Sequence, residues 1–138
     1  MFSGRLYWLI FALFIISPLA LFIISPSVAS AQMADKKSSP FEALRWNEDS
    51  PEVMVQSDWY RPLTIQGVDV ERILAFCKSS YGGKARKRFG EDLPVALQAM
   101  GHPLPAKVTL KLQRIKDGEV ITLADVPSTK SNRKAIWR

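Results

Sequence analysis

The stretch KVTLKLQRIKDGEVITL, residues Lys107–Leu123, decides the fold. In its first half Val108, Leu110 and Leu112 alternate with polar residues, which is the period-two pattern of a strand with one buried and one solvent face. Asp117-Gly118 follows, a dipeptide typical of two-residue hairpin turns because both residues tolerate positive φ. The stretch therefore predicts a β-hairpin whose apolar face needs a second layer to cover it.

A two-residue turn fixes the register of this hairpin. It places Arg114 opposite Ile121 and Leu112 opposite Leu123. Ile121 and Leu123 then share the apolar face of the first strand, whereas a one-residue slip would scatter the apolar side chains over both faces.

The N-terminal residues have the composition of a leader. Arg5 is the single charge among the first 34 residues, and residues 6–24 are almost wholly apolar. Ala29-Ser30-Ala31 fits the small-residue pattern of a signal-peptidase site, with cleavage before Gln32. We expect a signal peptide in residues 1–31; the alternative is an uncleaved inner-membrane anchor, since residues 6–24 are just long enough to span a bilayer. Both alternatives predict an exported chain, periplasmic or extracellular.

Cleavage would leave 107 residues (138 − 31), which is the size of one domain. Residues 32–77 carry five basic and eight acidic side chains, and residues 78–138 carry 13 basic and five acidic ones. The basic half favours an acidic partner or an anionic surface, while export argues against nucleic acid. Cys77 is the single cysteine, so no internal disulfide forms and stability must come from packing.

Further strands and helices complete an α+β prediction, a small antiparallel sheet packed on one or two helices. We expect strands at Val53–Gln56 and Trp59–Gln66, joined by a tight turn at Ser57-Asp58. Two helices are expected at Asp69–Lys78 and Leu93–Met100, the first with an apolar i, i+3, i+4, i+7 face that covers the hairpin.

The remaining segments of the mature chain are expected to lie outside the domain. Residues 32–50 read as a linker, in which residues 41–49 form one or two helical turns. Residues 127–138 read as a polar C-terminal tail. The predicted domain therefore covers residues 51–126.

Two stretches resemble PDZ-like domains of exported bacterial proteins. In LTIQGVDVERILAF, residues 63–76, Ile65-Gln66-Gly67 precedes a Val-containing helix, as in the strand, glycine turn and helix signature of that family. GHPLPAKVTLKLQR, residues 101–114, is similar to the later turn that leads into a Val-Thr-Leu strand. The resemblance covers roughly residues 53–126 and implies a PDZ-like fold that binds a peptide or protein partner.

The sequence departs from that family at three points. Residues 78–91 are longer and more basic than the corresponding segment. Val53–Tyr60 has no glycine, so the family's carboxylate-binding loop has no counterpart. The 138 residues also contain no protease domain, although such modules often belong to proteases.

The residues for catalysis or metal binding are few. Cys77 and His102 are the single cysteine and the single histidine, so they form the one possible nucleophile–base pair. Cys77 falls on the apolar helix face, where a free cysteine behaves as a small hydrophobe, and His102 has no evident orienting carboxylate. We therefore expect no enzyme, no metal site and no cofactor.

Two groups of residues are candidates for binding. Trp59, Tyr60 and Arg61 lie beside Pro62, which cannot donate a ladder hydrogen bond, so we expect a free strand edge or a bulge there. A peptide could add to an exposed edge at this point. The second group is a basic run that would contact anionic lipid or an acidic partner. It consists of Lys84, Arg86, Lys87 and Arg88.

Three functions follow from these observations. The first is a non-enzymatic, PDZ-like interaction module of the cell envelope that binds a protein or peptide. The second is a substrate-binding accessory part of a larger exported hydrolase, and the third is a structural protein bound to an anionic membrane surface through its basic run. The identity of the ligand and the oligomeric state are left open by the sequence.

Overall fold

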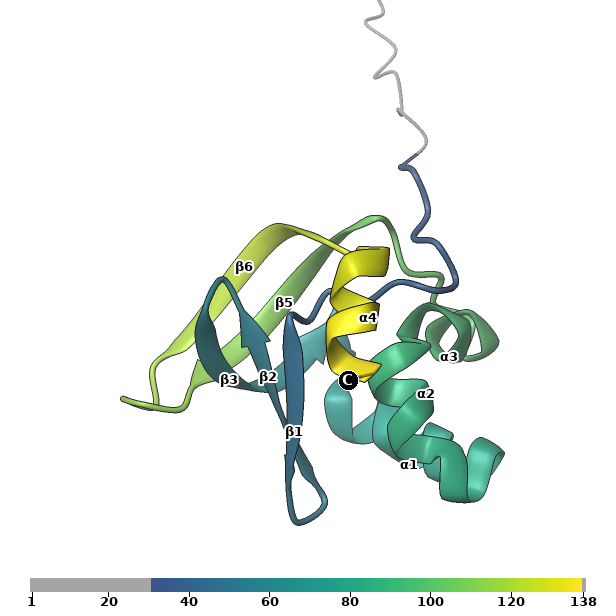
Figure 1. The fold of residues 1–138 in the computed structure, drawn as a ribbon, viewed down its shortest axis with the longest axis horizontal. Coiled ribbons are helices and arrows are strands. Elements are labelled where there is room, and N and C mark those ends of the chain that lie inside the picture. Colours follow the sequence, from purple (N-terminus) through teal and green to yellow (C-terminus); the bar gives the residue numbers. More distant parts are fainter. Residues whose placement is uncertain (1–30, 138) are drawn as a thin grey trace, which may run out of the picture.

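The computed structural model describes residues 31–137, so residues 1–30 of the predicted leader lie outside the described residues. The chain is α+β, with a six-stranded antiparallel sheet and a group of helices beside it (Figure 1). The elements in chain order are β1 Ala43–Asn47, β2 Ser50–Val55, β3 Asp58–Ile65, β4 Val68–Asp69, α1 Val70–Tyr81, the 3-10 turn η1 Gly82–Lys84, α2 Ala85–Glu91, α3 Leu93–Ala99, β5 Lys107–Arg114, β6 Val120–Pro127 and α4 Lys130–Trp137.

The sheet follows the order β1-β2-β3-β5-β6, and the short β4 pairs with β3. The helices α1 to α3 form the long connection between β4 and β5 and gather on one side of the sheet (Figure 1). This arrangement confirms the predicted α+β class with a small antiparallel sheet.

The β5–β6 hairpin forms, but with a longer turn than predicted. Leu112 lies opposite Ile121, and Leu110 lies opposite Leu123, a shift of two residues from the predicted register. The backbone N–H of Arg114 donates to the carbonyl of Glu119 at 2.8 Å, so the loop holds four residues, 115–118. Because the shift is even, Ile121 and Leu123 remain on the apolar face, where both are half-buried.

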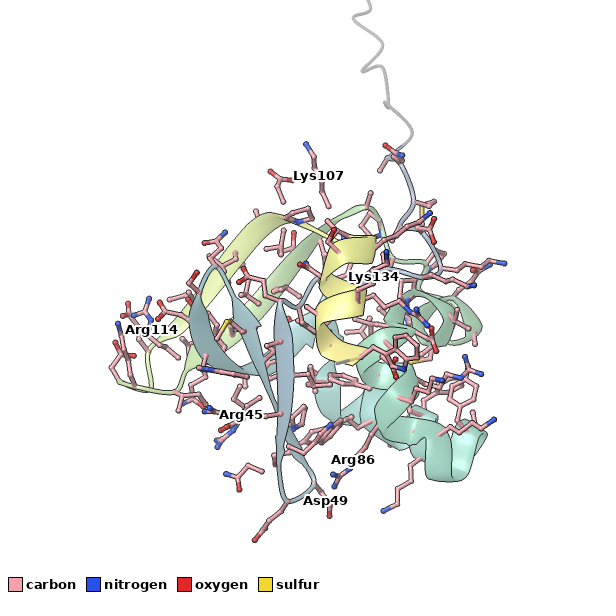
Figure 2. The ribbon with its side chains drawn as sticks, viewed as in Figure 1. Arg45, Asp49, Arg86, Lys107, Arg114 and Lys134 are labelled. Atoms are coloured by element: carbon pink, nitrogen blue, oxygen red, sulfur yellow. The ribbon has the colours of Figure 1, made fainter. Side chains whose placement is uncertain are left out.

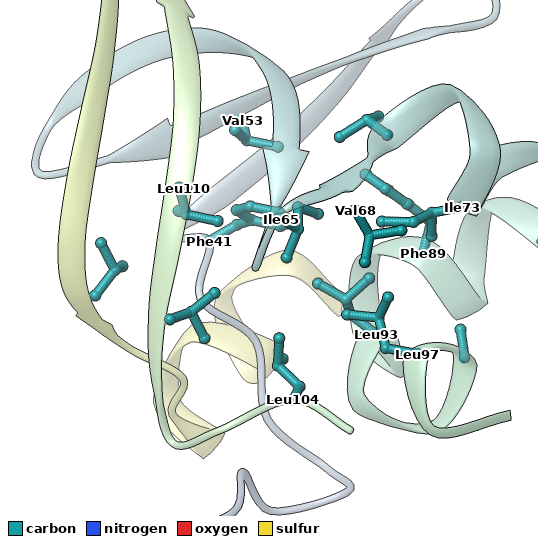
Figure 3. Close-up of a cluster of buried hydrophobic side chains, with 14 of the residues drawn as sticks. Phe41, Val53, Ile65, Val68, Ile73, Phe89, Leu93, Leu97, Leu104 and Leu110 are labelled. Carbon is teal, nitrogen blue, oxygen red and sulfur yellow. The ribbon is translucent and has the colours of Figure 1, made fainter. Parts of the chain in front are cut away.

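The core lies between the sheet and the helices (Figure 3). Ile73 and Cys77 of α1 are fully buried in the same cluster as Leu110 of β5. Leu93 and Leu97 of α3 extend this cluster and are also fully buried. The helix predicted at Asp69–Lys78 therefore does cover the sheet, although it begins one residue later and continues to Tyr81.

The helical turns predicted in residues 41–49 are wrong. This segment forms β1, which pairs with β2 over its full length. Leu44 and Trp46 pack partly buried against the core, two residues apart as in a strand, and Phe41 just before β1 is fully buried. Residues predicted as part of a linker thus supply the first strand of the sheet.

The polar tail predicted at residues 127–138 also differs, because residues 130–137 form α4. Thr129 caps this helix, since its Oγ1 accepts a hydrogen bond from the N–H of Asn132 at 3.1 Å. Arg133 fastens the helix to the end of α2 by donating from Nε to the carbonyl of Glu91 at 2.9 Å. The folded unit is therefore wider than the predicted 51–126.

Candidate functional site

β2 and β3 separate partway along their length. Their antiparallel pairing ends at Val53 opposite Tyr60, although β2 extends back to Ser50 and β3 continues to Ile65. Two residues beyond this last pair, Pro51 of β2 and Pro62 of β3 would face each other if the ladder continued. Neither proline has an N–H to donate, so the ladder cannot be completed there.

The separation leaves part of β3 without a neighbour on one side. Farther along the same edge of β3, Thr64 and Ile65 pair with β4. Residues 61–63 therefore have no strand partner on the edge of β3 that faces β2 and β4. On its other side β3 pairs with β5, with a bulge between Pro62 and Thr64. The result is a short strand gap that faces the beginning of α1.

A hollow of about 540 Å³ occupies this gap. Pro62 and Leu63 of β3 line it on one side, and Val70 and Leu74 of α1 line it on the other. We call the apolar lining formed by Leu63, Val70 and Leu74 its floor. A second hollow of about 410 Å³ adjoins it, because Asp49 and Leu74 line both. We call the two together the α1 groove.

The two walls of the α1 groove carry opposite charges. Arg61 of β3 and Lys111 of β5 stand on the strand side. Asp69 and Glu71 stand on the helix side, where Asp69 is the N-cap of α1 and Glu71 lies in its first turn. Both acids are favourable next to the positive end of the helix dipole, so their position has a structural reason.

The tip of the β1–β2 hairpin lies where the two hollows of the groove adjoin, because Asp49 lines both of them. Arg86 of α2 donates to the carbonyl of Glu48 at 2.7 Å and lies 3.5 Å from a carboxylate oxygen of Asp49. Its guanidinium also lies over the ring of Trp46, 4.7 Å from the centroid. Figure 2 shows Arg86 beside Asp49 at this end of the molecule.

The predicted peptide-binding residues are divided among three environments. Tyr60 is 3 % exposed and belongs to the core. Trp59 lies on the other face of the sheet beneath the guanidinium of Arg45, 4.0 Å from its ring centroid. Of the three, Arg61 alone lines the groove.

The free edge or bulge predicted at Pro62 is present as a bulge, because the β3–β5 ladder shifts register between Pro62 and Thr64. Trp59 does not lie at a free edge, since it pairs with Met54 of β2 and β3 lies between β2 and β5. The open part of β3 begins only at Arg61, after the pairing with β2 has ended.

The predicted basic run is also divided. Arg86 is bound to the hairpin tip as described, and Arg88 reaches Asp92 at 3.2 Å and lies over the ring of Tyr81. Lys84 and Lys87 are exposed and make no ion pair within residues 31–137. Two of the four cations are therefore committed to contacts inside the protein.

Cys77 and His102 lie in different environments. Cys77 is fully buried, and burial raises the pKa of its thiol to about 11, an effect that the charge of nearby Arg88 opposes. The thiolate, which is the nucleophilic form, is thus scarce at neutral pH. His102 is exposed. Among residues 31–137, no three His, Cys, Asp or Glu side chains gather as a possible metal site.

In the part of the chain that the structure describes, none of the helices has the length and hydrophobicity needed to cross a bilayer. Comparison with protein-family models, with curated proteins and with solved structures found no match for this chain. The function must therefore be argued from the site itself.

Most of the groove was not predicted from the sequence, because the groove depends on the register of β2 against β3. The turn lies at Gln56-Ser57, whose φ angles are 50° and 67°, and not at the predicted Ser57-Asp58. With the turn placed correctly, an extension of the β2–β3 ladder would bring Pro51 opposite Pro62. A pair of facing prolines in a predicted hairpin is the signal that would have indicated a gap.

Proposed function

We propose that this protein is a non-enzymatic interaction module that binds an extended peptide segment in the α1 groove. The observation that carries the proposal is the strand gap, where residues 61–63 of β3 have no strand partner on the side of the groove. Because Pro62 has no N–H, this edge can accept hydrogen bonds from the main chain of an extended peptide through its carbonyl oxygen but cannot donate one there, and the neighbouring hollows accept the side chains of the peptide. The floor formed by Leu63, Val70 and Leu74 suits an apolar side chain.

A PDZ-like character and a location in the cell envelope belong to the same proposal. The PDZ-like character is supported by the helix α1 beside an open strand edge and by the sequence resemblance in residues 63–76 and 101–114. The location in the cell envelope is supported by the apolar leader sequence of residues 6–24. Binding to a membrane through the basic run has less support, because Arg86 and Arg88 are engaged within the protein.

The test is selection from a random peptide library displayed on phage, followed by fluorescence polarisation with the selected peptides. Leu74→Arg places a long charged side chain in the floor that both hollows share, so it should abolish binding. Ser79→Arg is the matched control, since it adds the same side chain at an exposed position of the same helix that lines neither hollow. Thermal melting of both variants checks that the fold is retained.

Two results would overturn the proposal. One is that the library yields no peptide that binds the wild-type protein. The other is that Leu74→Arg, with an unchanged melting temperature, binds the selected peptides as well as Ser79→Arg does.

A further inference from the structure

We infer that the peptide accepted by the α1 groove is acidic, with a carboxylate that contacts Arg61 and Lys111 and an adjacent apolar side chain in the hollow between Leu63 and Leu74. This inference rests on the proposed function and adds the chemistry of the ligand. It depends on how the cations of the sheet are distributed.

Arg61 and Lys111 are neighbours on the solvent face of the sheet. Arg61 lies opposite Gln113 in the β3–β5 ladder, and Lys111 precedes Gln113 by two residues on the same strand. Residues two apart on a strand share a face, so the two cations are diagonal neighbours. Both are exposed and both line the larger hollow.

Within the described residues 31–137, these two cations have no carboxylate partner, in contrast to the other arginines of the strands. Arg45 is bound to Glu52 at 2.7 Å, and Arg114 contacts Asp117 and Glu119 at 3.1 and 3.0 Å. Arg61 and Lys111 form no ion pair within residues 31–137. Like charges side by side on a sheet are unfavourable, so the pair is suited to an anion supplied by a ligand.

The acidic residues of the groove strengthen this selectivity. Asp69 and Glu71 stand on the helix wall and would repel a carboxylate placed near α1. Asp49 lines the junction of the two hollows and lies close to Arg86. A ligand carboxylate is therefore directed toward the strand wall, which fixes how an acidic peptide lies across the groove.

A peptide fits this surface better than a uniform polyanion does. Polyanions such as heparin have repeated charge but no apolar side chain, whereas the floor between the walls is apolar. Two cations are also few for a polyanion, whose binding depends on many simultaneous charge contacts. An acidic residue next to an apolar residue satisfies both the strand wall and the floor.

The experiment begins with the same phage-displayed library and asks what the selected peptides have in common. We expect enrichment of Asp or Glu beside a large apolar residue. Against such a peptide, Arg61→Glu combined with Lys111→Glu should weaken binding about tenfold or more, and this loss should diminish at high salt. Replacing the acids of the peptide by Lys should restore binding to the double variant.

The matched control is Lys107→Glu combined with Lys116→Glu, which changes the net charge by the same amount on the hairpin that carries Lys111 but outside the groove. It should leave the affinity within about twofold of wild type. Heparin and phosphatidylglycerol vesicles serve as probes for a polyanion and for a lipid surface.

The outcomes distinguish this inference from the proposed function. Neutral or basic peptides whose binding is still abolished by Leu74→Arg would overturn the acidic ligand and leave the peptide groove standing. Equal losses from the two double variants would also overturn it, because only bulk charge would matter. Tight binding of heparin or vesicles without any selected peptide would overturn both the inference and the proposed function.

Discussion

Asp92 is the carboxylate that joins the C-terminal helix to the rest of the fold, and Asp92→Asn should destabilise the protein by about 2–3 kcal/mol. Its two oxygens accept hydrogen bonds from Arg88 and Arg133, both at 3.2 Å. The Asp92 side chain is 9 % exposed, whereas the arginines are 33 % and 24 % exposed. A hydrogen bond between charged groups contributes about 1.5–3 kcal/mol, and partial exposure of the arginines reduces the sum of the two.

Urea denaturation followed by circular dichroism measures this effect. With a slope of about 1–2 kcal/mol per molar urea, the midpoint should fall by about 1–3 M while the slope stays constant. Asp49→Asn is the control, because Asp49 also faces an arginine but is fully exposed, at 3.5 Å from Arg86. This exposed pair should change the stability by less than about 0.5 kcal/mol.

Equal effects of Asp92→Asn and Asp49→Asn would refute the reasoning, since burial is what separates the two pairs. A double-mutant cycle of Asp92→Asn with Arg133→Met adds a second check. Their coupling should exceed about 1 kcal/mol, because the two side chains are in direct contact. A coupling near zero would mean that α4 is held by its other contacts alone.

Three further predictions concern the core, the thiol and the hairpin turn. Leu110→Ala should cost about 2–5 kcal/mol in urea denaturation because the side chain is fully buried, while Val120→Ala on the paired strand, 49 % exposed, should cost less than about 1 kcal/mol. Cys77, whose pKa is raised to about 11 by burial, should react with a thiol reagent at pH 8 only at the rate of unfolding, and immediate reaction of the native protein would contradict this. The hydrogen bond from the N–H of Glu119 lowers the pKa of Asp117 below its ordinary 3.8. The Asp117 carboxylate therefore stabilises the fold above pH 3.8, and this contribution is lost as the pH falls through the lowered pKa. The stability difference between wild type and Asp117→Asn should shrink at acid pH, and a constant difference would exclude the effect.

The hairpin shows what period-two reasoning can and cannot determine. The pattern at Val108, Leu110 and Leu112 assigned the buried face correctly, although the turn and the register were wrong. The face is decided by burial of many side chains, whereas the loop length is decided by a few local hydrogen bonds, such as Glu119 N–H to the side chain of Asp117 at 3.0 Å. A register shift of two residues leaves each side chain on the same face, so the predicted buried face was correct although the predicted register was not.

α4 could not be predicted because its partners lie far away in the sequence. β1 was missed for another reason, since its partner β2 follows directly and the alternation of Leu44 and Trp46 was the only sign of a strand. α4 has only Ile136 as an apolar residue packed on the core, so its helical pattern was too weak to recognise. Its stability depends on Arg133 meeting Asp92, 41 residues earlier. The cation–π contact of Arg45 with Trp59 likewise requires β1, which explains why Trp59 was misread as an edge residue.

The candidate site was harder to predict than the fold. Arg61 was among the predicted binding residues and lines the candidate groove, whereas Leu63, Leu74 and Lys111 were not predicted, because none of them belongs to a recognisable motif. They come together only when the β2–β3 ladder ends and α1 packs across the gap. Such a site is a property of the register and of the packing, which a single sequence specifies only weakly.

The contact of α4 with β1 has a consequence for the order in which the protein is assembled. Ser39 and Thr129 exchange two backbone hydrogen bonds, each of 3.0 Å, immediately before these two elements. Leu44 of β1 and Ile136 of α4 both lie next to Gly90. The ribosome makes β1 early and α4 late, so a nascent chain lacks the contacts of α4 with β1 until residues 130–137 have emerged. A translation product cut short before α4 would present a strand edge and an apolar side chain, both of which chaperones and proteases recognise. The exposed surface of the protein thus differs according to whether α4 has been made.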